Sequence, residues 1–137
     1  MKLLQLAEFG IGRVHEAAAW LYDTVPFFDG QCEYMAKELL AGCSYTNKID
    51  VWSTGCVLLE MANLKGMWYN APGHHVFPQA IMFKVYSAIE SRSHEPFDED
   101  CPEEIKEMVL KATSNDPKER PTAQELYDQA EAIKSRL

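Results

Sequence analysis

The segment 47–63 constrains the fold more than any other part of the sequence, because its apolar residues surround almost the whole circumference of a helix. These residues are Ile49, Val51, Trp52, Cys56, Val57, Leu58, Leu59 and Met61. A helix that is apolar on all sides is typical of the buried centre of a domain. Gly55 costs such a helix about 1 kcal/mol relative to alanine, which indicates that a neighbouring element packs closely there. We therefore expect a central buried helix over 47–63.

Two further helices are predicted by the residues at their starts. Pro102 is followed by two glutamates, and proline at the first helical position with acids in the first turn favours a helix N-terminus. Thr122 and Glu125 have the spacing of a capping box, in which each side chain bonds the other residue's backbone amide. This box predicts a last helix over 122–137.

The remaining patterns complete a mainly α fold class. Apolar residues over 80–88 have the spacing of a moderately amphipathic helix. Leu4-Gln5-Leu6 alternates apolar and polar residues, which predicts a short N-terminal β-strand. The segment that follows, up to Gly30, has no regular period and is typical of a long loop.

Composition indicates one globular domain over 1–137 and limits its partners. The 137 residues are 47% hydrophobic and 25% charged, which is ordinary for a folded domain. The formal net charge of −8 repels phosphate groups, so we expect no nucleic acid and no membrane among the partners.

The 4 cysteines form no CxxC pair, which argues against a zinc site. No secretory leader is evident, and we expect an intracellular, cytoplasmic protein.

Four segments, in order, resemble the C-terminal lobe of eukaryotic protein kinases. Glu8-Phe9-Gly10 is similar to the family's Asp-Phe-Gly motif, and 30–38 is similar to the stretch that ends in Ala-Pro-Glu. The segment 50–61 resembles the family's central helix, and 116–123 matches the Asp-Pro-x-x-Arg-Pro-Thr-Ala turn before the last helix. The region from Gln79 onward is most similar to serine/threonine kinases of the MAP kinase kinase kinase group.

The resemblance implies a kinase-like C-lobe helical bundle with an activation-segment-like loop over 8–38. It also implies that the N-lobe and the catalytic loop are lacking, so we expect no catalytic residue in the chain. Family members use ATP and Mg²⁺, but we expect no cofactor for this chain. Glu8 stands where the family has its Mg²⁺-binding aspartate, and its additional methylene displaces the carboxylate from near-ideal octahedral geometry. Glu8 is therefore either a weak metal ligand or an ordinary acid at a strand end.

The resemblance also implies structural roles for other residues. Glu38 and Arg120 correspond to a buried ion pair that holds the activation segment to the helical core. Asp50 either binds backbone amides of the catalytic loop or caps its own helix, which also contains Trp52. Lys37 replaces the proline of Ala-Pro-Glu, and we expect this change to loosen the loop because lysine frees φ.

The activation segment contributes five further candidates. Phe9 and Gly10 belong to the motif discussed above, and Phe9 would pack on residues of the catalytic half. Tyr22 and Thr24 are the only hydroxyl side chains between Arg13 and Gly30, which makes them candidates for phosphorylation. Gln31 replaces the threonine that the family places near the substrate.

We expect a partial serine/threonine kinase domain that is inactive as this chain, like a pseudokinase, and functions in signalling by binding proteins. The cleft face around Leu4, Leu6 and Phe9 would be exposed, so protein partners or self-association are expected there. The alternative is a piece of a longer, active, ATP-dependent serine/threonine kinase. Upstream sequence with a phosphate-binding lysine and a His-Arg-Asp loop would favour that alternative. A helical interaction module unrelated to kinases would leave four motifs in register unexplained.

Overall fold

The structure, a computed structural model, describes residues 32–63, 67, 85–94 and 96–136. The named elements are a 3-10 helix η3 (Cys32–Tyr34), α1 (Lys37–Leu40), α2 (Lys48–Asn63), α4 (Glu103–Ala112) and α5 (Ala123–Lys134). Residues 85–90 are also helical. The mainly α fold is confirmed, since no strand occurs among these residues. The strand expected at 4–6 lies outside the described ranges.

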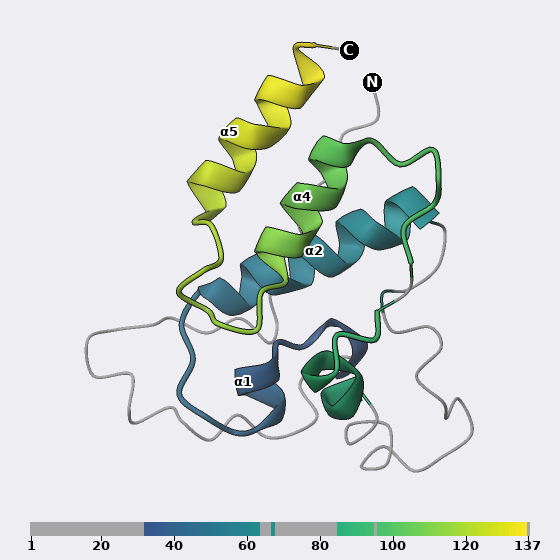
Figure 1. Cartoon of the computed structure of the whole chain (residues 1–137). Coiled ribbons are helices and arrows are strands. Elements are labelled where there is room, and N and C mark those ends of the chain that lie inside the picture. The colour runs from purple at the N-terminus through teal and green to yellow at the C-terminus, as the bar shows by residue number, and fades with distance from the viewer. Residues whose placement is uncertain (1–31, 64–66, 68–84, 95, 137) are drawn as a thin grey trace.

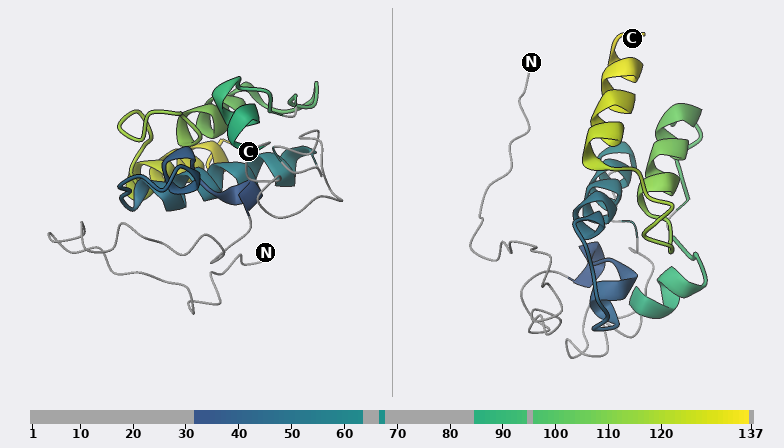
Figure 2. Two further views of the ribbon diagram at one scale, coloured as in Figure 1. Left: turned by 90° about the horizontal axis from the view of Figure 1, so that it is seen from below. Right: turned by 90° about the vertical axis from the view of Figure 1, so that its left-hand side faces the viewer.

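α2 passes through the middle of the described helices, as Figure 1 shows. α4 packs along α2, and α5 contacts both of these helices. α1 and the helical residues 85–90 lie next to each other below α2 in Figure 1, and the right-hand view of Figure 2 also shows them side by side. The helix predicted at 47–63 therefore has the central position expected for it, beginning at Lys48.

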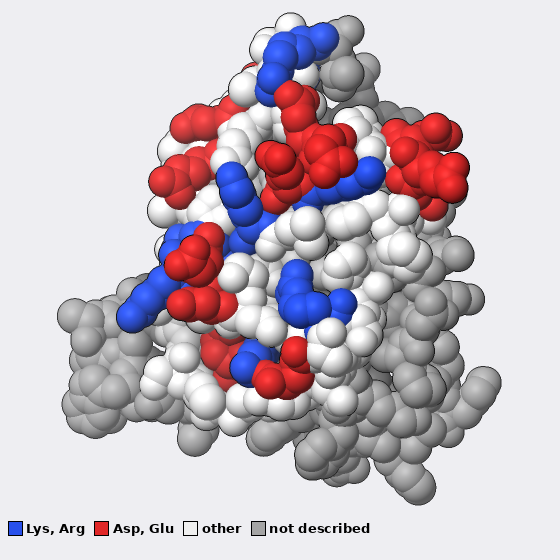
Figure 3. Space-filling model, viewed as in Figure 1, with Lys and Arg blue, Asp and Glu red and all other residues white. Residues whose placement is uncertain are grey.

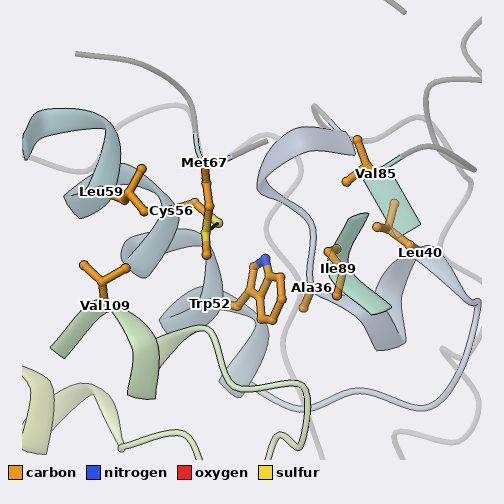
Figure 4. Packing of buried hydrophobic residues seen from close by; sticks show 9 residues of the cluster. All are labelled: Ala36, Leu40, Trp52, Cys56, Leu59, Met67, Val85, Ile89 and Val109. Carbon is orange, nitrogen blue, oxygen red and sulfur yellow. Dashed lines mark hydrogen bonds between the residues drawn. The ribbon is translucent and has the colours of Figure 1, made fainter. Parts of the chain in front are cut away.

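The main core surrounds Trp52, whose side chain has no exposed surface. Figure 4 shows the indole between side chains of α1 and 85–90 on one side and side chains of α2 and α4 on the other. The nine buried members of this cluster are Ala36, Leu40, Trp52, Cys56, Leu59, Met67, Val85, Ile89 and Val109. A second cluster of Val51, Met108, Ala112 and Leu126 joins α2, α4 and α5.

The burial of α2 is incomplete. Its fully or nearly buried residues are Val51, Trp52, Gly55, Cys56, Leu59 and Asn63. Val57 is 36% exposed and Met61 is 61% exposed, so the expectation of a helix enclosed on every side is not met at these two residues. An apolar pattern reports which side chains favour burial, but it does not report whether another element covers them.

α2 and α4 approach closely at Gly55, as the sequence indicated. A Cβ atom on Gly55 would lie 2.7 Å from Thr113 Cγ2 and 2.9 Å from Ala112 Cβ, both shorter than normal carbon–carbon contacts. Thr113 is completely buried, and its hydroxyl donates a hydrogen bond of 2.8 Å to the carbonyl of Val109. The absence of a side chain at Gly55 therefore sets how closely the two helices pack.

The ends of α4 and α5 differ slightly from the prediction. Pro102 is the N-cap of α4, and the helix begins one residue later at Glu103. The capping box of α5 is present, with Glu125 N donating to Thr122 Oγ1 at 3.1 Å and Thr122 N donating to Glu125 Oε2 at 2.7 Å. α5 ends at Lys134, and residues 135 and 136 form a turn, so the helix stops shortly before the end predicted near Leu137. The amide of Arg136 bonds the carbonyl of Ile133, three residues earlier, which closes the last turn.

The loop before α4 is attached to the end of α2 by one buried side chain. Asn63 Nδ2 donates to the carbonyl of Pro96 at 2.6 Å, and Asn63 Oδ1 accepts from the amide of Asp98 at 3.3 Å. Asp98, Glu99 and Asp100 are exposed on this loop. Figure 3 shows acidic side chains gathered at this end of the molecule. No helix in the described part of the chain is long and apolar enough to cross a membrane.

Candidate functional site

Glu38 in α1 and Arg120 in the turn before α5 form a bidentate ion pair, although they are 82 residues apart in the sequence. Arg120 Nη1 donates to Glu38 Oε1 at 2.6 Å, and Arg120 Nη2 donates to Glu38 Oε2 at 2.9 Å. The Arg120 side chain is 0% exposed and the Glu38 side chain 11%. The structure thus brings together the two residues that the resemblance pairs.

Two further N–H groups of Arg120 donate to backbone carbonyls. Nε donates to the Ser114 carbonyl at 2.8 Å, and Nη1 also donates to the Lys48 carbonyl at 3.2 Å. The guanidinium carbon lies 4.9 Å from the centroid of the Trp52 ring, a cation–π contact. In return, Lys48 Nζ donates a hydrogen bond to the carbonyl of Arg120. A buried guanidinium is tolerated when its nitrogens are hydrogen-bonded and its charge is paired, and here each of the three nitrogens donates at least one hydrogen bond.

The segment just before α1 is attached to α2 by Tyr34. The Tyr34 hydroxyl donates to Glu60 Oε2, and Ser53 Oγ donates to the Tyr34 carbonyl at 2.7 Å. The hydrogen bond to Glu60 and partial burial raise the pKa of Tyr34 to about 12. Two contacts to α2 therefore fix the backbone and the ring of this residue. No local sequence pattern relates Tyr34 to Glu60, because the two residues are 26 positions apart.

Lys37 begins α1 and is held by a side-chain contact that no sequence pattern predicts. Its Nζ forms an ion pair with Glu90 and lies 6.0 Å from the centroid of the Tyr86 ring. The carboxylate of Glu90 raises the pKa of Lys37. The loosening expected from replacing proline is therefore opposed by a contact that proline could not make.

Several predicted site residues lie outside the described ranges: Glu8, Phe9, Gly10, Tyr22, Thr24 and Gln31. Asp50 is described and exposed in the first turn of α2, at the positive end of the helix dipole. Trp52, in contrast, is buried against Arg120. Within the described ranges, no group of three or more histidine, cysteine, aspartate or glutamate residues is arranged to hold a metal ion.

Comparisons with known proteins point to the same family as the resemblance. A family model described as Protein kinase domain matches residues 1–130. The chain is 27% identical to serine/threonine-protein kinase Nek8 of Danio rerio over 135 residues, covering 98% of the chain and 18% of that protein. It is 31% identical to mitogen-activated protein kinase kinase kinase 5 of Homo sapiens over 126 residues, covering 90% of the chain and 8% of that protein.

A third relative is mitogen-activated protein kinase kinase kinase YODA of Arabidopsis thaliana, 34% identical over 104 residues, which cover 75% of the chain and 11% of that protein. Across eight such relatives, the chain spans between 8% and 27% of their length. This share fits the C-terminal lobe of a kinase domain, as does the helical fold with its Glu38–Arg120 pair. The chain belongs to the protein kinase family.

Proposed function

We propose that these 137 residues are the C-terminal lobe of a serine/threonine kinase domain of the MAP kinase kinase kinase type, and that they transfer no phosphate by themselves. The observation that carries this proposal is Glu8 at the family's metal-binding position, in a sequence that contains no His-Arg-Asp motif. In place of catalysis, the lobe binds other proteins in an intracellular signalling pathway.

Phosphoryl transfer in this family depends on placing ATP and Mg²⁺ against an acceptor hydroxyl. The family aspartate helps to hold the metal between the phosphate oxygens, and a glutamate in its place changes the distance from backbone to carboxylate. Glu8 is the one residue of this chain that the resemblance assigns to the metal. The contacts of Tyr34 with Glu60 and of Glu38 with Arg120 support a different role, as a scaffold in which residues 34–38, the end of the activation-segment-like loop, are held on the helical core.

A radiolabelled-ATP assay tests the absence of transfer. The 137-residue polypeptide is incubated with Mg·ATP and a generic protein substrate, beside its Glu8→Ala and Glu8→Asp variants. We expect all three to give the same background signal, because positioned metals and a catalytic base supply most of the rate enhancement. Transfer by the unchanged polypeptide clearly above the Glu8→Ala control would contradict the proposal.

Nucleotide binding is tested separately by thermal shift. A ligand with a Kd near 100 μM stabilises a protein by about 1.4 kcal/mol at 1 mM, by mass action. We expect no Mg²⁺-dependent shift of that size in this polypeptide, because the base-binding surface of the family is supplied largely by the other lobe. A reproducible shift that needs both Mg²⁺ and ATP would show that a nucleotide site is present.

The second candidate function is catalysis, with this chain as one part of a longer, active ATP-dependent kinase. The observation that favours it is the small share of each relative's length, 8% to 27%, that the chain covers. A chimaera tests it, in which these residues replace the matching part of an active relative. If the segment supports catalysis, the chimaera with Glu8 is weakly active and Glu8→Asp raises its activity at least tenfold. If both chimaeras are inactive while the parent is active, this second function is wrong.

Self-association, one of the two forms of protein binding expected of the lobe, is tested by sedimentation velocity. The proposed surface is the cleft face around Leu4, Leu6 and Phe9. Within the described residues, Val57 and Met61 on α2 are exposed apolar side chains and form a second candidate surface. We expect association that grows with concentration and weakens on Phe9→Ser or Met61→Lys. A monomer at every concentration, unaffected by either change, would count against self-association through these side chains.

A further inference from the structure

Lys37 and Glu38 are neighbours at the start of α1, but their side chains reach different parts of the fold. Glu38 bonds the buried Arg120, as described above. Lys37 reaches Glu90, and its ammonium also lies 6.0 Å from the centroid of the Tyr86 ring. Tyr86 and Glu90 are four residues apart on one helix, so they share a face. α1 is therefore connected to two other segments by charged groups on consecutive residues.

The helical residues 85–90 are fixed on their inner face and at their C-terminal end. Val85 is 1% exposed and Ile89 is 0% exposed, both within the main core. The end is closed by Arg92, which has a φ of 53°, with the amide of Arg92 bonding the Ile89 carbonyl at 3.1 Å and that of Ser93 bonding the Ala88 carbonyl at 2.9 Å. These are the two hydrogen bonds of a Schellman motif.

The outward face of the helical residues 85–90 is held by a different contact, the Lys37–Glu90 ion pair. Glu90 is exposed, with 46% of its side chain accessible, and Lys37 is 31% accessible. The position of Lys37 is itself set by Glu38, the next residue, through the pair with Arg120. The ion pair between Lys37 and Glu90 therefore links the helical residues 85–90 to a part of α1 that the buried Glu38–Arg120 pair also holds.

We propose that Lys37 is an electrostatic tether that couples the helical residues 85–90 to α1 at a position where the kinase family has proline. A proline stiffens its own backbone but has no side chain that reaches a second helix. A lysine leaves the local backbone freer and forms a connection across space. Because both groups are partly exposed, the connection weakens when salt screens it.

Hydrogen exchange of the full 137-residue polypeptide tests this tether. Lys37→Met keeps most of the side chain's apolar length but removes its charge. We expect the amides of Ser91, Arg92 and Ser93, which close the helix, to exchange about two to five times faster in this variant, the range for loss of a partly exposed ion pair. Raising the salt concentration to about 1 M accelerates the same amides in the unchanged protein, but not in Lys37→Met.

Further variants separate a tether from a local effect on α1. Glu90→Gln reproduces the faster exchange, and the Lys37→Met/Glu90→Gln double variant exchanges no faster than either single one. Lys37→Pro restores the family residue, yet the amides of Ser91–Ser93 exchange as fast as in Lys37→Met. Lys134→Met removes one partner of the exposed Lys134–Glu131 pair and leaves these amides unchanged.

Circular dichroism verifies that each variant folds. The proposal is overturned if Lys37→Met leaves exchange at Ser91–Ser93 and its salt dependence unchanged. It is also overturned if the effects of Lys37→Met and Glu90→Gln add, because two additive changes have no shared contact.

Discussion

At the scale of single residues, Tyr34 shows how a hydrogen bond changes the ionisation of a side chain. Its hydroxyl donates to the carboxylate of Glu60, and loss of the phenolic proton would place two negative charges against each other. The pKa of Tyr34 is therefore raised to about 12. The neutral tyrosine, and not its phenolate, is the form that holds the segment before α1 on α2.

This ionisation predicts how stability changes in alkali. The pKa is higher in the folded protein than in the unfolded chain, so the folded state binds the proton more tightly. The stabilisation from the phenolic proton is fully present below about pH 10 and is lost as pH rises through about pH 12. Urea titrations between these pH values compare the protein with Tyr34→Phe. We expect the difference in unfolding free energy to shrink toward pH 12, and a constant difference would contradict the Tyr34–Glu60 bond.

Sequence motifs predicted some of these residue contacts but not others. The Glu38–Arg120 ion pair could be predicted because both residues stand in motifs that resemble paired motifs of the kinase family. Tyr34–Glu60 and Lys37–Glu90 were not predicted, since each joins side chains on different elements and no family motif pairs them. The reach of a lysine across two helices depends on how those helices are placed, and neither composition nor spacing contains that information. The signal for Lys37 was its departure from the family's proline.

At the scale of elements, the packing of α2 on α4 depends on Gly55. Replacing glycine by alanine within a helix normally stabilises it by about 1 kcal/mol. Here the added methyl group would lie 2.7 Å from Thr113 Cγ2 and 2.9 Å from Ala112 Cβ. Thr113 cannot turn away without losing its hydrogen bond to the Val109 carbonyl. We expect steric conflict to outweigh helix propensity.

Gly55→Ala is therefore predicted to destabilise the protein by about 1–3 kcal/mol, the usual range for overpacking a core. Chemical denaturation measures the change. Thr113→Ser removes the nearer of the two contacting methyl groups and should recover part of the loss in the double variant. Thr54→Ala, on the exposed side of α2, is the matched control and should change stability by no more than about 0.5 kcal/mol. A stabilised Gly55→Ala variant would mean that α2 and α4 are farther apart.

α5 depends more on its cap than the other long helices do. Leu126 is its one buried residue, so packing contributes little to holding it. Thr122→Ala removes the acceptor of the Glu125 amide and should cost about 1 kcal/mol. Hydrogen exchange should show the loss in the amides of the first turn of α5, with those of α2 unchanged. Equal acceleration in both helices would instead indicate that the cap supports the whole fold.

Helices with strong local signals were predicted better than their surroundings. The capping box predicted the start of α5, and the apolar pattern predicted the start of α2 to within one residue. The end of α5 was misplaced because no residue near Lys134 resembles a terminating glycine or proline. Exposure of Met61 was also missed, since coverage of an apolar side chain is decided by the neighbouring elements.

At the scale of the whole molecule, the Glu38–Arg120 pair connects the beginning of the described chain to the turn before its last helix. Arg120 also contacts Trp52 and the Lys48 carbonyl, so one guanidinium joins α1, α2 and the turn before α5. No other ion pair among the described residues has a side chain as buried as that of Arg120. The assignment to a kinase C-terminal lobe depends structurally on this connection.

A double-mutant cycle on Glu38 and Arg120, followed by chemical denaturation, tests this account most directly. Removing one partner of a buried pair typically costs about 3–5 kcal/mol, a large share of a total stability of about 5–15 kcal/mol. Arg136→Ala is the control, since its pair with Glu104 is exposed and should contribute less than about 1 kcal/mol. We predict large losses for Glu38→Ala and Arg120→Ala, with the double variant destabilised by clearly less than their sum. Small, additive losses no larger than that of the control would contradict the account.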